Sequence, residues 1–288
     1  MLKERLAIRM FRDAGGELGV RVDVDYVFRN EGSAPVTTEV AFPAPPRKLD
    51  TLLDPPKALL DFKAWQGKRP VPLTRQIHAL VHGRDEAALL RGLGIDIENF
   101  GNHNDPDADQ IGRLLPADGA RLVQAGLLAD NGWPVWTSET TWHWTQVFPP
   151  GKVVHLRHEY TPWPGGEGAE WVPIESFLQR YTTKSCLDVQ GAAALRRVSA
   201  ASEEEKRLRG YRGRRIPHAM WVDYILTTAN SWKTPIRDFE LTVEAPRDWV
   251  GAFCWDGPVE RLPDGRQVAH VADFVPAKEL RVYFFGLL

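Results

Sequence analysis

The stretch Val20-Arg-Val-Asp-Val-Asp-Tyr-Val-Phe-Arg29 alternates apolar with mostly charged side chains. Successive side chains of a strand point to opposite faces, so this pattern predicts a strand with one buried face and one charged, solvent-exposed face. A turn-forming segment, 30–35, follows, and the alternation resumes over 36–42. We therefore predict a hairpin between 20–29 and 36–42.

A second alternating pair predicts another hairpin. Thr141-Trp-His-Trp-Thr-Gln-Val-Phe148 is followed by Pro149-Pro-Gly151 and then by Val153-Val-His-Leu-Arg-His-Glu-Tyr160. Trp142, Trp144 and Phe148 share one face of the first strand, and the turn formers separate it cleanly from the next. We predict that these two strands pair with each other.

The remaining segments predict a mainly β protein, α+β by content, with two antiparallel, sandwich-like lobes. Residues 84–131 are helical in composition and form an insertion in the first lobe. The turn-rich Pro164-Gly-Gly-Glu-Gly168 sets the lobe boundary, which gives an N-terminal lobe of 1–165 and a C-terminal lobe of 166–288. Short helices from Pro173 open the second lobe, and antiparallel strands follow.

Charge and hydropathy exclude several classes of protein. The 288 residues include 36 Lys and Arg against 38 Asp and Glu, so nucleic-acid binding lacks its usual driving force. No apolar run approaches the ~20 residues that a membrane-spanning helix needs. The first residues, Met1-Leu-Lys-Glu-Arg-Leu-Ala-Ile8, lack the sections of a secretion signal.

Several short segments, in order along the chain, resemble the bacterial family called domain of unknown function 4424. They are Tyr26–Asn30, Val40–Pro43, Leu89–Gly94, Trp142–Gly151, His158–Pro162, Tyr224–Asn230 and Phe253–Gly257. The resemblance implies an exported protein, periplasmic or secreted, although the export signal that members usually carry is missing here. The first lobe is also weakly similar to the vault and inter-alpha-trypsin β-sandwich domain, a likeness of fold alone.

Cys186 and Cys254 are the two cysteines of the chain. From the residues alone, a bridge between them and a pair of buried free thiols are equally open. The export that the family resemblance implies favours the disulfide, because exported proteins fold in an oxidising compartment.

Candidate metal ligands are few. His78 and His82 are spaced so that both rings could lie on one side of an element, and Asp105, Asp107 and Asp109 alternate as calcium ligands do. The glutamate of a zinc hydrolase and the glycine and distal glutamate of an EF-hand are missing. We therefore favour solvated histidines and a polar turn, and we expect no metal and no cofactor.

Tryptophan is the one residue type in excess, with eleven copies, several of them in turn-rich segments. Trp133, Trp136 and Trp163 could offer flat surfaces to a ligand, and burial between sheets is the alternative for each. The sequence thus favours a non-catalytic binding or interaction module of the cell envelope, with an envelope protein, a peptide or a glycan as partner. An envelope hydrolase, with or without a metal, and a purely structural envelope domain are the alternatives.

Overall fold

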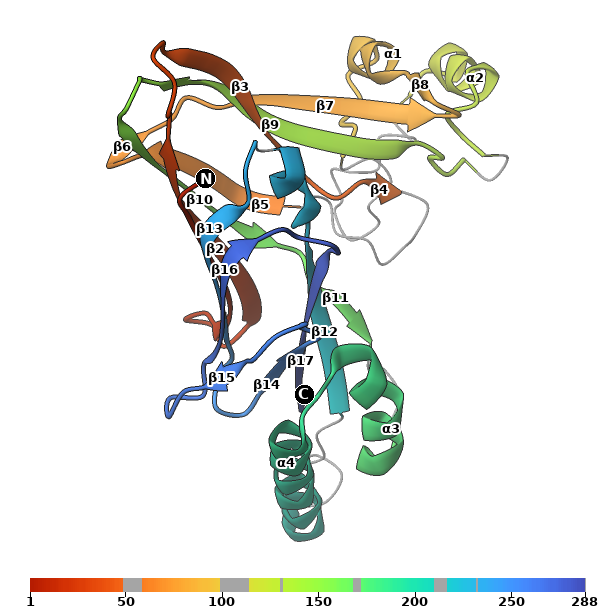
Figure 1. Ribbon diagram of the computed structural model, residues 1–288. Helices are drawn as coiled ribbons and strands as arrows, with labels where there is room; N and C mark the ends of the chain where they lie inside the picture. Colours follow the sequence, from red (N-terminus) through yellow and green to blue (C-terminus); the bar gives the residue numbers. More distant parts are fainter. Residues whose placement is uncertain are drawn as a thin grey trace. The chain divides into compact units, whose positions relative to one another are not determined.

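The computed structural model is mainly β, as predicted (Figure 1). It describes residues 1–48, 59–98, 114–129, 132–167, 172–209, 217–231 and 233–287. Contacts divide the chain into two compact units: unit 1 comprises 1–33, 61–69 and 150–288, and unit 2 comprises 34–60 and 70–149. The predicted lobe boundary at residue 165 does not follow this division, because strands from both ends of the chain share one sheet in unit 1.

The large sheet of unit 1 has eight strands in the order β15-β16-β13-β1-β2-β10-β5-β6. Their bounds are β1 Lys3–Arg12, β2 Leu18–Arg29, β5 Leu59–Gln66, β6 Arg69–Pro70, β10 Val153–Pro162, β13 Ile236–Glu244, β15 Glu260–Arg261 and β16 Gln267–Phe274. β1 pairs antiparallel with β2 on one side and parallel with β13 on the other. The first strand of the chain is therefore an interior strand of this sheet.

Both predicted hairpins are wrong in their pairing, although all four strands exist. β2 pairs with β1 and β10, whereas β3 (Val36–Pro43) pairs with β9 (Thr137–Phe148). The two predicted turns carry the chain from one sheet to another, and they are joined where the Gly151 N–H donates to the Asn30 carbonyl at 2.8 Å. The alternation of apolar and polar residues predicts which side chains share a face of a strand, but it does not predict which strand pairs with it.

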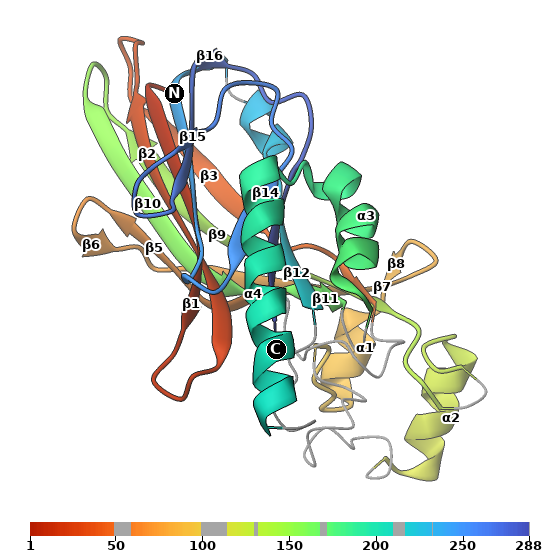
Figure 2. The same cartoon turned by 90° about the horizontal axis from the view of Figure 1, so that it is seen from below.

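The second sheet of unit 1 has the order β11-β12-β17-β14 and carries two helices on one face (Figures 1 and 2). The bounds are β11 Gly165–Glu167, β12 Pro217–Tyr224, β14 Val250–Phe253, β17 Leu280–Leu287, α3 Ile174–Ser185, α4 Val189–Arg209 and a 3-10 turn, η3, at Thr227–Ser231. Phe177 and Tyr181 of α3 pack on Phe285 of β17, with ring centroids 5.8 and 5.3 Å away. The helices bury this face of the sheet.

The opposite face of the four-stranded sheet packs against the eight-stranded sheet. The hydroxyls of Tyr26 and Tyr224, one from each sheet, lie 3.3 Å apart. Gln267 of β16 donates from Nε2 to the Gly251 carbonyl of β14 at 2.6 Å. Unit 1 is therefore a sandwich of two sheets with helices outside the smaller one. The interior includes fully buried side chains of both sheets: Leu6, Ile8, Val22, Val24, Phe239, Leu241, Val282 and Phe284.

A disulfide joins Cys186 and Cys254 and confirms the pairing that the family resemblance favoured. Cys186 ends α3 in the left-handed backbone conformation, and Cys254 follows directly after β14. The bond links residues 68 positions apart and so fastens the helical layer to an edge strand of the small sheet. Closing a loop of this length stabilises a fold by on the order of 4 kcal/mol in the chain-entropy account.

Unit 2 contains a sheet in which β3, β9, β7 and β8 follow one another and β4 also pairs with β9. The further bounds are β4 Arg47–Lys48, β7 Thr74–Val81, β8 Arg84–Asp85, α1 Ala87–Gly92 and α2 Pro116–Gln124. Leu90 of α1, Leu122 of α2 and Trp136 are fully buried members of one core cluster. The helical segments predicted after Arg84 and after Pro116 are thus present as α1 and α2, and most of the helix predicted over 107–115 lies outside the described residues. Among the described helices, none combines the length and apolarity that a membrane crossing would require.

Candidate functional site

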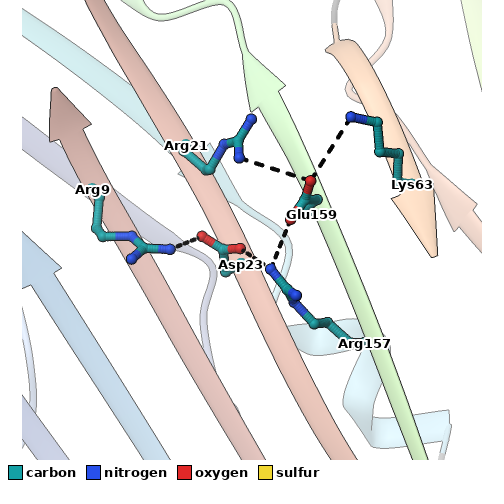
Figure 3. Close-up of polar contacts among 6 residues, drawn as sticks. All are labelled: Arg9, Arg21, Asp23, Lys63, Arg157 and Glu159. Atoms are coloured by element: carbon teal, nitrogen blue, oxygen red, sulfur yellow. Dashed lines mark hydrogen bonds and ion pairs between the residues drawn. The ribbon is translucent and has the colours of Figure 1, made fainter. Parts of the chain in front are cut away.

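The outer face of the eight-stranded sheet carries a group of interacting charges. On β2, Val22 and Val24 point into the sandwich, so Arg21 and Asp23 point to the opposite, outer face. The register places Glu159 of β10 directly opposite Asp23. The members of this charged cluster, drawn in Figure 3, are Arg9 of β1, Arg21 and Asp23 of β2, Arg157 and Glu159 of β10, and Lys63 of β5.

Arg157 bridges the two carboxylates of the charged cluster. Its Nη2 donates to Asp23 Oδ1 at 2.9 Å and to Glu159 Oε2 at 2.7 Å, and Arg9 pairs with the other oxygen of Asp23 (Figure 3). The Asp23 side chain is 7% exposed and that of Glu159 is 12% exposed. Like charges directly opposite each other destabilise a sheet, so the Arg157 guanidinium is what allows this cross-strand pair.

The hydrogen bonds of the charged cluster keep Asp23 ionised. Burial raises the pKa of the Asp23 carboxyl, but hydrogen bonds from Arg9 and Arg157 outweigh burial and hold the pKa below its usual value. The same bond to Asp23 raises the pKa of Arg157. Asp23 therefore offers no proton near neutral pH, and its role in the geometry is to fix Arg157 and Arg9 in place.

Arg21 and Lys63 are held less tightly than the other two cations. Arg21 Nη1 lies 3.7 Å and Lys63 Nζ lies 3.9 Å from the same oxygen, Glu159 Oε1, and both distances exceed that of a normal hydrogen bond. Their side chains are 39% and 54% exposed. The charged cluster contains four cationic side chains and two carboxylates, and Asp25, directly opposite Arg157 on the same face, adds one more carboxylate at its border, so cations still outnumber carboxylates there.

Two aromatic rings flank the charged cluster on the same face. The Arg157 guanidinium lies over the ring of Trp65 on β5, 5.1 Å from its centroid, at a distance typical of a cation–π contact. Phe11 of β1 is 37% exposed and follows Arg9 on the outer face. Its ring covers Gly19, where a Cβ atom would come within 2.8 Å of Cζ, so a side chain at this position would push the Phe11 ring aside.

The three tryptophans singled out in the sequence lie in different surroundings. Trp163, in the loop after β10, is 53% exposed and belongs to unit 1. Trp133 is half-buried and belongs to unit 2. Trp136 is 0% exposed, and its Nε1 donates to the Ile97 carbonyl at 3.0 Å, so its ring is part of the core of unit 2 and offers no face to a ligand.

The two candidate histidine ligands lie in different surroundings. His78 on β7 directs Nδ1 to Asp85 Oδ2 at 2.5 Å, whereas His82 occupies the turn between β7 and β8 with a φ of 48°. In the described part of the chain, no group of three or more His, Cys, Asp or Glu residues is placed to hold a metal ion. The acidic loop residues Asp105, Asp107 and Asp109 lie outside the described residues.

The charged cluster could have been found only in part from the sequence. The alternation around Val20–Phe28 indicates that Arg21 and Asp23 share the solvent-facing side of one strand. The alternation of the later strand indicates the same for Arg157 and Glu159. The pattern predicts that 153–160 pairs with 141–148, whereas β10 pairs with β2, so the cross-strand pair of Asp23 with Glu159 does not follow from the sequence.

Comparison with known proteins gives the family. The family described as "Domain of unknown function (DUF4424)" matches residues 3–283, nearly the whole chain. The chain belongs to the DUF4424 family. A comparison with curated proteins found no match to this DUF4424 chain.

A comparison with solved structures also returned a match. It is described as a "putative nutrient binding protein" of Legionella pneumophila subsp. pneumophila, and it has 13% sequence identity and a TM-score of 0.49. The alignment covers 99% of the DUF4424 chain and 66% of the Legionella protein, so the chain spans about two thirds of that protein's length.

Proposed function

We propose that this DUF4424 protein is an exported, non-catalytic binding module of the cell envelope. Its contact surface is the outer face of the eight-stranded sheet around Arg157. The observation that carries this proposal is the fixed position of Arg157, which two carboxylates and the Trp65 ring hold on an open sheet face. A charged donor that is held in advance loses little side-chain entropy when it binds a ligand.

Export is supported by the disulfide between Cys186 and Cys254. Disulfides persist in the periplasm and outside the cell, and they are rare in the reducing cytosol. The family resemblance points to the same compartment. We therefore place the binding surface in the envelope, where its ligands would be an envelope protein, a peptide or a glycan.

Binding is favoured over hydrolysis by the protonation state of the charged cluster. A general acid or base works best with a pKa near the working pH, whereas hydrogen bonds from two arginines hold the pKa of Asp23 below its usual value. A group in that state orients its neighbours but transfers no proton. The surface presents side-chain donors and aromatic rings, which are the groups that ligand recognition uses.

The test is a binding screen of the labelled full chain against arrays of glycans and peptides. We expect one class of ligand to be retained, to be recovered chemically unchanged, and to bind at least severalfold more weakly to Trp65→Ala. Trp65→Phe serves as the milder variant, and thermal unfolding verifies that each variant is folded. No retained ligand, or conversion of the ligand, would overturn the proposal.

Trp163→Ala is the competing variant in the same screen. Trp163 is the most exposed of the three tryptophans singled out in the sequence. If its loss weakens binding while Trp65→Ala does not, the contact surface is the loop after β10, and the assignment to the sheet face is wrong.

A further inference from the structure

We infer that the ligand of the charged cluster is an acidic glycan, whose carboxylate groups are bound by Arg21 and Lys63. This inference rests on the proposed function, because it names the ligand class of the same surface. Three features carry it: the excess of positive charge, the absence of free strand edges on this part of the face, and the flanking aromatic rings.

The positive charge of the charged cluster exceeds what its own carboxylates need. Asp23 is neutralised by Arg9 and Arg157, and Arg157 also donates to Glu159. Arg21 and Lys63 therefore approach a carboxylate that already has a closer cation. Cations held side by side repel one another, and an anionic ligand would relieve this repulsion.

Arg21 and Lys63 are close enough to share one anionic group. Since Arg21 Nη1 and Lys63 Nζ lie 3.7 and 3.9 Å from the same Glu159 oxygen, they are at most about 7.6 Å apart. A ligand carboxylate between them could accept a hydrogen bond from each, and an arginine fork suits the planar geometry of a carboxylate. Asp25, the next carboxylate of β2 on this face, lies four positions from Arg21. The part of the charged cluster around Arg21 is therefore more positive than the part near Asp25.

The strands under the charged cluster favour a glycan over a peptide. β1, β2 and β10 are interior strands, each with a neighbour on both sides. Their backbone groups are used in the sheet, so an extended peptide could not add to them as a further strand. Recognition must come from side chains. The ring of Phe11, 37% exposed, offers a flat surface on which a sugar ring can stack, and the half-buried ring of Trp65 supports the Arg157 guanidinium beside it.

The test measures binding of the full chain to polygalacturonate, with neutral dextran and poly-glutamate as comparison probes. Wild type is expected to bind polygalacturonate and to prefer it over both other probes. The double variant Arg21→Ala/Lys63→Ala should bind polygalacturonate about tenfold more weakly, or worse, because two charged contacts are lost. Arg21→Gln/Lys63→Gln repeats the measurement if the alanine variant is unstable.

The matched control removes one arginine and one lysine elsewhere in unit 1. Arg207 and Lys278 are 73% and 52% exposed and pair with Glu204 and Asp256. Arg207→Ala/Lys278→Ala changes the net charge by the same amount, and we expect its affinity to stay within about twofold of wild type. Equal losses in both double variants would indicate nonspecific attraction and would overturn the inference.

Two further outcomes separate this inference from the proposed function. A preference for dextran or poly-glutamate that is lost in Trp65→Ala overturns the acidic glycan and leaves the sheet face as the binding surface. Binding that is unchanged in both Trp65→Ala and Arg21→Ala/Lys63→Ala overturns both proposals, because neither part of the face then contributes.

Discussion

Glu4 of β1 lies directly opposite Tyr26 of β2, and the side chain of Glu4 points into the interior of unit 1, where it is 3% exposed. Burial alone raises the pKa of the Glu4 carboxyl to about 8. Burial also raises the pKa of Tyr26 and of Tyr224, and the nearby Glu4 charge raises both further. At neutral pH the interior therefore favours a protonated, neutral Glu4.

The first prediction concerns Glu4→Gln. The folded form binds the Glu4 proton more tightly than the unfolded form, so the free energy of unfolding should fall as pH rises from about 4.5 toward 8. Glutamine cannot ionise, and the variant should gain a few kcal/mol over wild type by pH 8, since each unit of pKa shift corresponds to about 1.4 kcal/mol. Denaturant unfolding at several pH values measures this difference. If the difference in unfolding free energy between variant and wild type does not change with pH, Glu4 is not the buried, protonated carboxyl described above.

The second prediction concerns the stability of the protein at acidic pH. His158 is fully buried beside Tyr26 and Phe62, with ring centroids 5.5 and 5.6 Å away, and burial lowers the pKa of its imidazole to about 3, against a smaller opposing effect of Asp23. The folded form disfavours protonation, so stability should be lost as pH falls from about 6.5 toward 3. In His158→Phe this part of the pH dependence should be missing. If the free energy of unfolding changes equally with pH in wild type and variant between pH 6 and 4, this prediction is wrong.

The third prediction concerns the bridge in the charged cluster. Arg157→Leu leaves Asp23 and Glu159 directly opposite each other without their shared donor. We expect a loss of about 1–3 kcal/mol in the free energy of unfolding, because two mostly buried carboxylates each lose a charged hydrogen-bond donor, although Asp23 keeps its pair with Arg9. Adding Asp23→Asn removes one of the two charges, and the double variant should recover part of the loss. A double variant less stable than the single one would contradict this account.

The fourth prediction concerns the disulfide. Cys186→Ala/Cys254→Ala opens the loop between α3 and β14, and the variant should lose up to on the order of 4 kcal/mol of stability. Reducing agent should destabilise wild type by a similar amount and leave the variant unchanged. A thiol titration of the native, non-reduced protein should detect no free thiol. Two titratable thiols would exclude the bond.

The faces of the strands could be predicted from the sequence, because alternation follows directly from strand geometry. Val20, Val22 and Val24 are all buried as expected, and the charged residues between them lie on the outer face. The neighbours of the strands could not be predicted. The parallel pairing of β1 with β13 joins distant segments, and nothing in either segment specifies its partner.

The candidate site could be predicted less well, since it depends on these pairings. Asp23 and Glu159 are 136 positions apart and meet only through the register of β2 with β10. Trp136 could not be placed from the sequence either. Its turn-rich segment is typical of an exposed ring, yet the ring is fully buried and its Nε1 donates a hydrogen bond. Composition identifies a large amphipathic side chain, whereas the surrounding tertiary structure decides whether it is covered.

The parallel pairing of β1 with β13 also constrains how the chain is made and delivered. During synthesis, or passage through a membrane with the N-terminus leading, Glu4 emerges 235 positions before its partner Phe239. Until then, one edge of β1 is unpaired and can associate with other chains. We therefore expect a truncation before Ile236 to yield aggregates instead of a smaller folded protein, because it leaves this edge of β1 permanently unpaired.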